Sequence, residues 1–135
     1  MSNVDSNILQ ALSAQASVMI AALSYPAVWS QKGGDKPAGE HVTIQQLPND
    51  NNQLGLSDQT MDRQGFLIIT LVSPLDVYEI VSRRKAGDIA AYFLSGARFT
   101  ANATKVAIMS HSVRQGRQEG QRWETPIWIS YRSIA

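Results

Sequence analysis

The sequence has 135 residues, of which 44% are hydrophobic and 17% charged, and its formal net charge is +1. This length is typical of one hydrophobic core, so we expect residues 1–135 to form a single domain. The hydrophobic fraction suffices for a buried core and excludes a chain that is disordered throughout. The absence of cysteine excludes disulfides and thiolate metal sites, and two histidines alone do not make a structural zinc site.

The N-terminal region has no basic stretch before its apolar residues, and no window approaches 18 consecutive apolar residues. Both observations argue against a signal peptide or a membrane span. We therefore expect a protein that is made in the cytoplasm and has no membrane partner.

The charge is divided unevenly along the chain. Residues 1–82 carry three basic and eight acidic side chains, a net charge of −5, whereas residues 83–135 carry nine basic and three acidic side chains, a net charge of +6. Such a division can direct the basic part toward nucleic acid or toward the acidic surface of another subunit. The alternative is that folding mixes both halves on one surface.

The first segment has the pattern of an amphipathic helix that ends at Tyr25-Pro26. Ser2 followed by Asp5 fits a capping box, and a residue before proline is disfavoured in a helix. The opposite face is polar and uncharged, which suits water or a neighbouring subunit. Apolar residues recur at helical spacing at Ile8, Leu9, Leu12, Ala16, Met19, Ile20 and Leu23.

Residues 30–40 have the composition of an exposed loop, and alternation over 42–47 predicts a short strand closed by Pro48. Residues 49–65 are rich in Asn, Asp and Gln, with Leu54, Leu56 and Met61 as anchors. A connection of this length is usually functional or mobile.

Residues 66–72 are apolar at both odd and even positions, which predicts a central strand covered on both faces. A helix is expected next, with Ser73 as N-cap, Pro74 at its first position, Asp76 near its positive end and Gly96 after it. An apolar ridge of Val77, Val81, Ile89 and Phe93 lies along it, with the stem of Lys85 filling a gap.

Residues 104–113 and 123–131 alternate as strands, and the polar residues 114–121 join them as a hairpin. A minor strand is expected near residues 98–100. The resulting fold class is α+β, with element order αββαββ. We expect a mixed, largely antiparallel four-stranded sheet with two helices packed on it.

No residue constellation predicts catalysis, a cofactor or a metal site. Residues 33–36 resemble a phosphate loop only superficially, because the glycine spacing and the Ser or Thr after the lysine are missing. His41 and His111 are expected at strand ends facing solvent. Asp58 and Asp62 would share a helix face but are expected to be solvated. The sequence therefore predicts a protein that is not an enzyme.

Concentrated positive charge occurs in two places, at Arg83 and Arg84 and in the hairpin at Arg114, Arg117 and Arg122. Solvated side chains are the plain interpretation, and contacts with a partner's acids or with passing DNA phosphates are the sharper one. We expect the hairpin to be the better candidate because it would project from the sheet.

Trp128 is the most informative single residue. If Ile127, Ile129 and Tyr131 face the core, Trp128 shares the opposite side with Ser130 and Arg132. An exposed tryptophan beside an arginine is typical of interface hot spots. The alternative is that a helix covers this side too. Trp29 is expected to close one end of the first helix.

Read in order, these segments resemble the tail terminator family of long-tailed bacteriophages, whose members are also called tail-completion or minor tail proteins. The resemblance spans nearly the whole chain. It is carried, in chain order, by Pro26-Ala27-Val28-Trp29, Leu47-Pro48, Leu54-Gly55, Arg63-Gln64-Gly65-Phe66, Asp88-Ile89-Ala90-Ala91-Tyr92-Phe93 and Trp123-Glu124-Thr125-Pro126-Ile127-Trp128-Ile129. At residues 73–76 the chain lacks the glycine-rich turn common in the family.

The resemblance implies a structural role without an active site. Such proteins form a ring, usually a hexamer, that caps the tail tube, stops its polymerisation and offers a surface for head joining. The implied partners are copies of itself, the tail tube protein, a head-completion or connector protein and, transiently, DNA. The implied location is the virion tail, and the host cytoplasm during assembly.

Within such a ring, residues 49–65 and the hairpin arginines would make axial or lumenal contacts. One alternative is a head-to-tail connector, or neck protein, of the same virion. Another is a sequence-independent nucleic-acid-binding module that uses the basic C-terminal half. A small-ligand enzyme would need a concave pocket with convergent polar groups.

Overall fold

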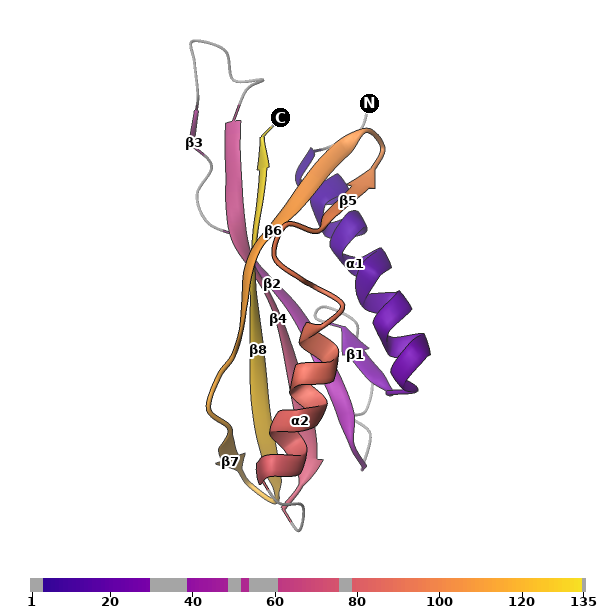
Figure 1. The fold of residues 1–135 in the computed structure, drawn as a ribbon, viewed down its shortest axis with the longest axis vertical. Coiled ribbons are helices and arrows are strands. Elements are labelled where there is room, and N and C mark those ends of the chain that lie inside the picture. The colour runs from indigo at the N-terminus through magenta and orange to yellow at the C-terminus, as the bar shows by residue number, and fades with distance from the viewer. Residues whose placement is uncertain (1–3, 30–38, 49–51, 54–60, 76–78, 135) are drawn as a thin grey trace.

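The computed structural model describes residues 4–29, 39–48, 52–53, 61–75 and 79–134, which form two helices and eight strands (Figure 1). In chain order the elements are α1 (Val4–Leu23), β1 (Ala27–Trp29), β2 (His41–Pro48), β3 (Asn52–Gln53), β4 (Met61–Pro74), α2 (Glu79–Ala90), β5 (Arg98–Ala101), β6 (Thr104–Val113), β7 (Arg117–Glu119) and β8 (Arg122–Ile134).

The strands form one mixed sheet in the order β1-β2-β4-β8-β6-β5, with β3 added on β4 and β7 on β8. Only β1 and β2 run parallel among the described strand pairs. The expected four-stranded sheet and the order αββαββ are therefore wrong. Strands β1, β3 and β7 have only two or three residues each, which is too short to show an alternating pattern.

Both helices contribute to one core on one face of this sheet (Figure 1). Residues at alternate positions of the central strands are fully buried there, whereas their neighbours Phe66, Ile68 and Thr70 are only half-buried. The prediction that residues 66–72 are covered on both faces is thus wrong. The core includes Ile8, Leu12, Ala16 and Met19 of α1, Ala86 and Ile89 of α2, and Leu67, Ile69, Leu71, Ile127 and Ile129 of the sheet.

Helix α1 ends at Leu23, where Ser24 adopts a φ of 60° before Tyr25-Pro26, so the predicted end of the helix is confirmed. The predicted cap at Ser2 lies outside the described residues. The stretch Ser6–Leu23, with a mean hydropathy of 1.3, is long and apolar enough by length and composition to cross a membrane. Core helices meet the same criterion, and one side of α1 is buried against the sheet.

Helix α2 begins at Glu79, so the predicted start at Ser73-Pro74 is wrong. These two residues end β4, because they continue its pairing with Trp123 and Arg122 of β8. Ser73 is buried, and its hydroxyl donates to Glu40 Oε2 at 3.5 Å. Asp76 and Val77 lie outside the described residues.

The buried side of α2 differs from the predicted ridge, because Val81 is only half-buried. Ser82 and Ala86 are fully buried instead, together with Ile89. Lys85 is directed toward Glu40, with Nζ 3.0 Å from each carboxylate oxygen.

The polar segment at residues 49–65 is strand in part. Asn52 and Gln53 pair with Asp62 and Met61, so β4 begins well before Phe66. Asp62 is consequently in a strand and not on a helix face, and Asp58 lies outside the described residues. Leu54 and Leu56 also lie outside them.

Candidate functional site

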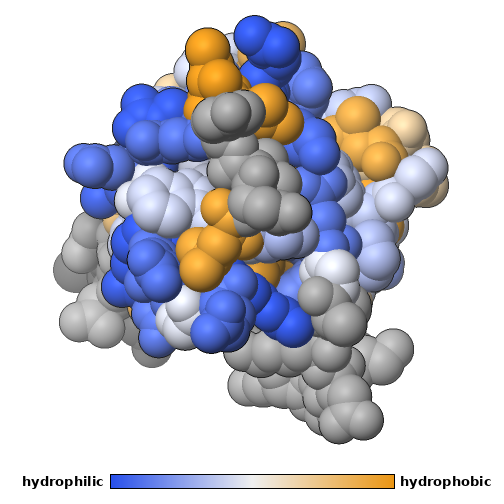
Figure 2. All heavy atoms as spheres, turned by 90° about the horizontal axis from the view of Figure 1, so that it is seen from below, coloured by the Kyte–Doolittle hydropathy of each residue, from blue (hydrophilic) through white to orange (hydrophobic). Residues whose placement is uncertain are grey.

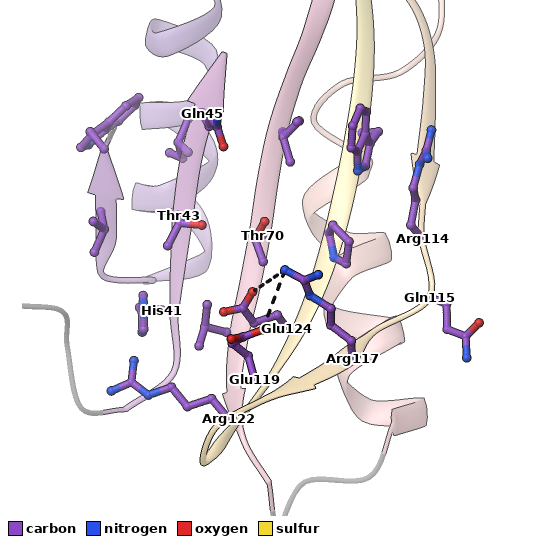
Figure 3. A pocket seen from close by; sticks show the side chains of 17 residues that line it. His41, Thr43, Gln45, Thr70, Arg114, Gln115, Arg117, Glu119, Arg122 and Glu124 are labelled. Atoms are coloured by element: carbon purple, nitrogen blue, oxygen red, sulfur yellow. Dashed lines mark ion pairs between the residues drawn. The ribbon is translucent and has the colours of Figure 1, made fainter. Parts of the chain in front are cut away.

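A hollow of about 890 Å³ lies on the face of the sheet that the helices leave open (Figure 3). The central strands contribute Thr43 of β2 and Ile68 and Thr70 of β4. These side chains alternate with core residues because successive residues of a strand point to opposite faces. The hollow is bounded by Trp29 of β1 on one side and by β7 and β8 on the other.

Trp128 of β8 is the centre of a small cluster in this hollow. Its ring lies edge-on to Phe66, with centroids 5.1 Å apart and an interplanar angle of 71°. The Arg114 guanidinium lies over the same ring at 4.3 Å from its centroid. Arg114 is held in place because its backbone N–H donates to Pro126 O at 2.9 Å.

This placement decides between the two interpretations of Trp128. Ile127, Ile129 and Tyr131 are buried in the core, as predicted. Trp128 is half-buried on the opposite face, where arginine and an aromatic ring surround it and no described helix covers it. Aromatic and arginine side chains that are half-buried in one subunit are typical of protein interfaces.

The charged side chains of the hollow form loose ion pairs. Arg117 Nη2 lies 3.9 Å from Glu119 Oε2 and 4.0 Å from Glu124 Oε1, both drawn in Figure 3. The Arg117 side chain is 73% exposed, so these pairs add little to stability. Arg117 is therefore available for contacts with a partner.

His41 lines the hollow and is only 1% exposed, so the prediction that it faces solvent is wrong. Its Nδ1 donates to Gly39 O at 2.9 Å, and Nε2 has no hydrogen-bond partner. His111 is exposed, as predicted, and its Nδ1 donates to Phe93 O at 3.1 Å.

Of the residues predicted as interface or lumen, Arg114, Arg117, Arg122 and Trp128 line the same hollow. Arg132 lies farther along β8, opposite Gln64 and Ala107, and does not line it. Sequence spacing alone could not show that Arg114, Arg117 and Arg122 line one hollow, with Arg114 over the Trp128 ring.

Arg83 and Arg84 are exposed on α2, which packs on the other face of the sheet. Arg83 forms an ion pair with Glu79 one helical turn away, at 3.2 Å. Leu54 and Leu56 cannot be placed, since they fall outside the described residues.

The hairpin does not project from the sheet as expected. Arg117, Gln118 and Glu119 pair with Glu124, Trp123 and Arg122, so β7 extends the sheet beside β8.

Sequence reasoning missed His41, Thr43 and Thr70 as members of this surface. The signal was the alternation of polar and buried residues along β2 and β4. Thr43 and Thr70 pair with each other and alternate with the buried residues Val42 and Leu71. A polar pair between two buried pairs indicates a face that stays open.

The chemistry of the hollow is that of a contact surface. It offers aromatic edges, arginines and threonines, but within the described ranges no three His, Asp or Glu side chains are grouped to hold a metal ion.

No curated protein matches the chain. Several solved structures share its fold, including two that match nearly the whole chain. One, a protein known by a sequence number alone, is 16% identical, with a TM-score of 0.77 over 95% of this chain and 93% of that one. The other belongs to the virion of a native gene transfer agent particle and is 10% identical, with a TM-score of 0.63 over 100% of both chains.

The model of one protein family, described as phage tail terminator protein, matches residues 7–131. The match includes nearly all described elements and confirms the resemblance seen in the sequence motifs. The chain belongs to the phage tail terminator family.

Proposed function

We propose that this protein forms a ring that caps the phage tail tube, ends tube polymerisation and provides the surface to which the head joins. The observation that carries the proposal is the family match over residues 7–131. The mechanism is geometric. A closed ring satisfies its lateral interfaces, and one axial face fits the tube while the other does not fit further tube subunits, so addition stops.

The partners in this proposal are further copies of the chain, with six copies in the ring, the tail tube protein and a head-completion or connector protein. The ring would be assembled in the host cytoplasm and would then remain in the virion tail. The fold similarity to a component of a gene transfer agent virion supports a place within a particle of this kind.

We assign the helix-free face of the sheet to the channel of the ring. Arg114, Arg117 and Arg122 gather on this face, and the Arg117 side chain is largely exposed. Positive charge along a channel attracts DNA phosphates without reading sequence. Trp128 and Arg132 of the same face, together with Arg83 and Arg84 on α2, are the remaining candidates for contacts within the virion.

The first experiment is negative-stain imaging of tails assembled with and without the protein. Tubes of uncontrolled length, or tails without heads, are expected when it is absent. Tails of normal length that join heads normally in its absence would overturn the proposal.

A second experiment locates the functional face. The double variant Arg114→Glu with Arg117→Glu reverses charge in the hollow and is expected to reduce head joining and infectivity. Arg83→Glu with Arg84→Glu reverses two exposed charges on α2, on the other face of the sheet, and is the matched control. If Arg83→Glu with Arg84→Glu abolishes head joining while Arg114→Glu with Arg117→Glu has no effect, the functional charge lies on α2 instead.

The principal alternative is a head-to-tail connector of the same virion, and the two roles differ in the partner that is bound. Binding to assembled tube protein supports a terminator, whereas binding to portal or capsid adaptor supports a connector. A nucleic-acid-binding module is less well supported, because Arg114 already lies over one face of the Trp128 ring. A base could not stack on that face without displacing it.

A further inference from the structure

On each side of the sheet, part of one strand has no described strand beside it. These strands are β2 and β6, and their uncovered parts lie in the same row of paired residues. Strand β1 pairs with β2 only at Val42, Thr43 and Ile44, so no described strand lies outside residues 45–48. Strand β5 pairs with β6 only over residues 104–107, so in the described part of the chain no strand lies outside residues 110–113.

The pairing register places these edges directly across from each other. Gln46 pairs with Leu67, Leu67 with Ile129, and Ile129 with His111. Across this row the sheet consists of β2, β4, β8 and β6 among the described strands. The two open edges therefore flank the sheet at one height.

The strand directions suit a junction between copies. Strand β2 is antiparallel to β4, β4 to β8, and β8 to β6, so β2 and β6 run in opposite directions. In a head-to-tail ring, β6 of one copy meets β2 of the next in antiparallel orientation. This arrangement uses two different edges and closes without leaving either exposed.

At both edges a backbone amide also points outward, to the side where a strand of a second copy would lie. Val42 N–H donates to Pro26 O on the β1 side, so by alternation the amide of Gln46 points away from β4. Arg114 N–H donates to Pro126 O in β8, so by the same alternation the amide of His111 points away from β8. Gln46 and His111 thus present outward hydrogen-bonding groups in the same row.

These edges lack the charged side chains that usually protect exposed strands, and only the end of the β2 edge is limited by a proline, Pro48. Residues 45–48 and 110–113 carry no Asp, Glu, Lys or Arg. Leu47 is 43% exposed at one edge, and Met109 is 51% exposed beside the other. Natural edges are normally blunted by charges or covered, because an open edge pairs with other chains. An uncharged edge with an exposed apolar side chain is what an interface strand requires.

We propose that residues 110–113 of β6 in one copy pair antiparallel with residues 45–48 of β2 in a second copy, with His111 opposite Gln46. This inference rests on the proposed ring and names its lateral contact. In this register Leu47 faces Ser110 on the helix-free side, while Gln46 and His111 lie on the helix side. Repetition around the ring joins the sheets into one continuous wall with the helices outside.

Cross-linking tests the register, and the chain has no cysteine of its own. In the double variant Leu47→Cys with Ser110→Cys, the two positions of neighbouring copies lie within disulfide distance. Oxidation of the protein bound to tail tubes is expected to give a ladder of covalently linked copies. The matched control is Gln46→Cys with Ser110→Cys, whose side chains lie on opposite faces and are expected to link poorly.

A proline substitution tests the backbone contact. Gln46→Pro removes an N–H that points away from β4, so β2 keeps its pairing with β4. Gln46→Ala is the matched control, because both variants lose the side-chain hydrogen bond from Nε2 to Tyr131 Oη but only proline loses the N–H. Gln46→Pro is expected to weaken self-association, measured by sedimentation, about tenfold relative to Gln46→Ala.

The outcomes separate this inference from the proposed function. Rings on tail tubes without the expected ladder, together with equal association of the proline and alanine variants, would overturn the edge pairing and leave the capping role standing. If the unaltered protein forms no ring, either alone or on tubes, both the edge pairing and the proposed function are overturned. Should Gln46→Pro fail to fold, the cross-linking result decides.

Discussion

The two faces of the central strands behave differently although they are made by adjacent residues. On the covered face, Ile69 and Ile127 have no exposed surface. One residue along each strand, Ile68 and Trp128 are only half-buried. The contrast cannot come from residue type, because Ile68 and Ile69 are the same amino acid.

The difference shows how one sheet serves two purposes. The covered face is filled by α1 and α2 and supplies the burial that stabilises the fold. The open face keeps aromatic and arginine side chains at the surface of the single chain, around a hollow. Folding therefore uses every second residue of β4 and β8, and the residues between remain partly exposed on the single chain.

The sharpest test of this comparison is the pair Ile69→Ala and Ile68→Ala. The first variant opens a cavity in a packed core and is expected to lose about 2–5 kcal/mol of unfolding free energy. The second removes a half-buried side chain next to a hollow and is expected to lose clearly less. Urea denaturation of both variants measures the difference, and equal losses would contradict a division between the two faces.

Gly65→Ala tests the covered face at the point where β4 lies close to the backbone of β2 and to the Tyr131 hydroxyl. An added Cβ would lie 2.7 Å from Leu47 O and 2.6 Å from the Tyr131 hydroxyl. Since the first of these atoms is backbone, we expect a loss of about 1–3 kcal/mol, as for an overpacked core. Thermal unfolding measures it.

The control for Gly65→Ala is Gly87→Ala in α2, where nothing lies within 4 Å of the added Cβ. That variant is expected to be stabilised by up to about 1 kcal/mol, because alanine favours a helix over glycine. Equal destabilisation of both variants would contradict the close approach at Gly65.

The alternation of apolar residues along a strand was the most reliable pattern in the sequence. It predicted the two long C-terminal strands and assigned Ile127, Ile129 and Tyr131 to the core, with Trp128 on the other side. It worked there because, apart from Trp128, polar or small residues stand between the buried ones.

The same reasoning failed where the open face is itself apolar. Because Phe66 and Ile68 are apolar, residues 66–72 were predicted to be covered on both faces of the sheet. No described helix covers the face on which Phe66 and Ile68 lie. An apolar open face and a core face share a composition, so hydropathy does not separate them. The packing of α1 and α2 on one face alone supplies the distinction.

Local signals were also overruled by strand pairing. Ser73-Pro74 has the chemistry of a helix start, yet both residues continue β4 because β8 offers partners up to Arg122. His41 was expected in solvent but is buried at the first residue of β2. In both cases the paired strand is distant in sequence, since Ser73-Pro74 pairs with β8 and His41 pairs with Val72 of β4.

Arg114→Ala tests the open face, and its expected loss of unfolding free energy is smaller than that of Ile69→Ala or Gly65→Ala. It removes the guanidinium that lies 4.3 Å from the Trp128 ring centroid, a contact that contributes about 0.5–1 kcal/mol at an exposed site. We expect a loss of this size and a change in tryptophan fluorescence. Arg114→Lys should retain part of the contact. A loss comparable to that of Ile69→Ala would show that the open face also stabilises the fold.

A change at Tyr25 is expected to have the smallest effect on the free energy of unfolding, and only at alkaline pH. Burial raises the pKa of Tyr25 above its ordinary value of 10.0, and the nearby carboxylates of Glu40 and Asp88 raise it further. The folded state therefore holds the phenol proton more tightly than the unfolded state. This contribution to stability is fully present below about pH 10 and is lost as the pH rises through the higher pKa of the folded protein.

Tyr25→Phe should consequently lose less stability than the unaltered protein between pH 8 and pH 11, as measured by urea midpoints at each pH. Glu40→Gln should lower the pKa of Tyr25, because it removes one of the carboxylates that raise it. Tyr25 packs against the core between α1 and β1, whereas the contact between Arg114 and Trp128 lies on the open face. If the alkaline loss of stability were identical in Tyr25→Phe and the unaltered protein, the ionisation that weakens the fold would have to lie elsewhere than at this edge of the covered face.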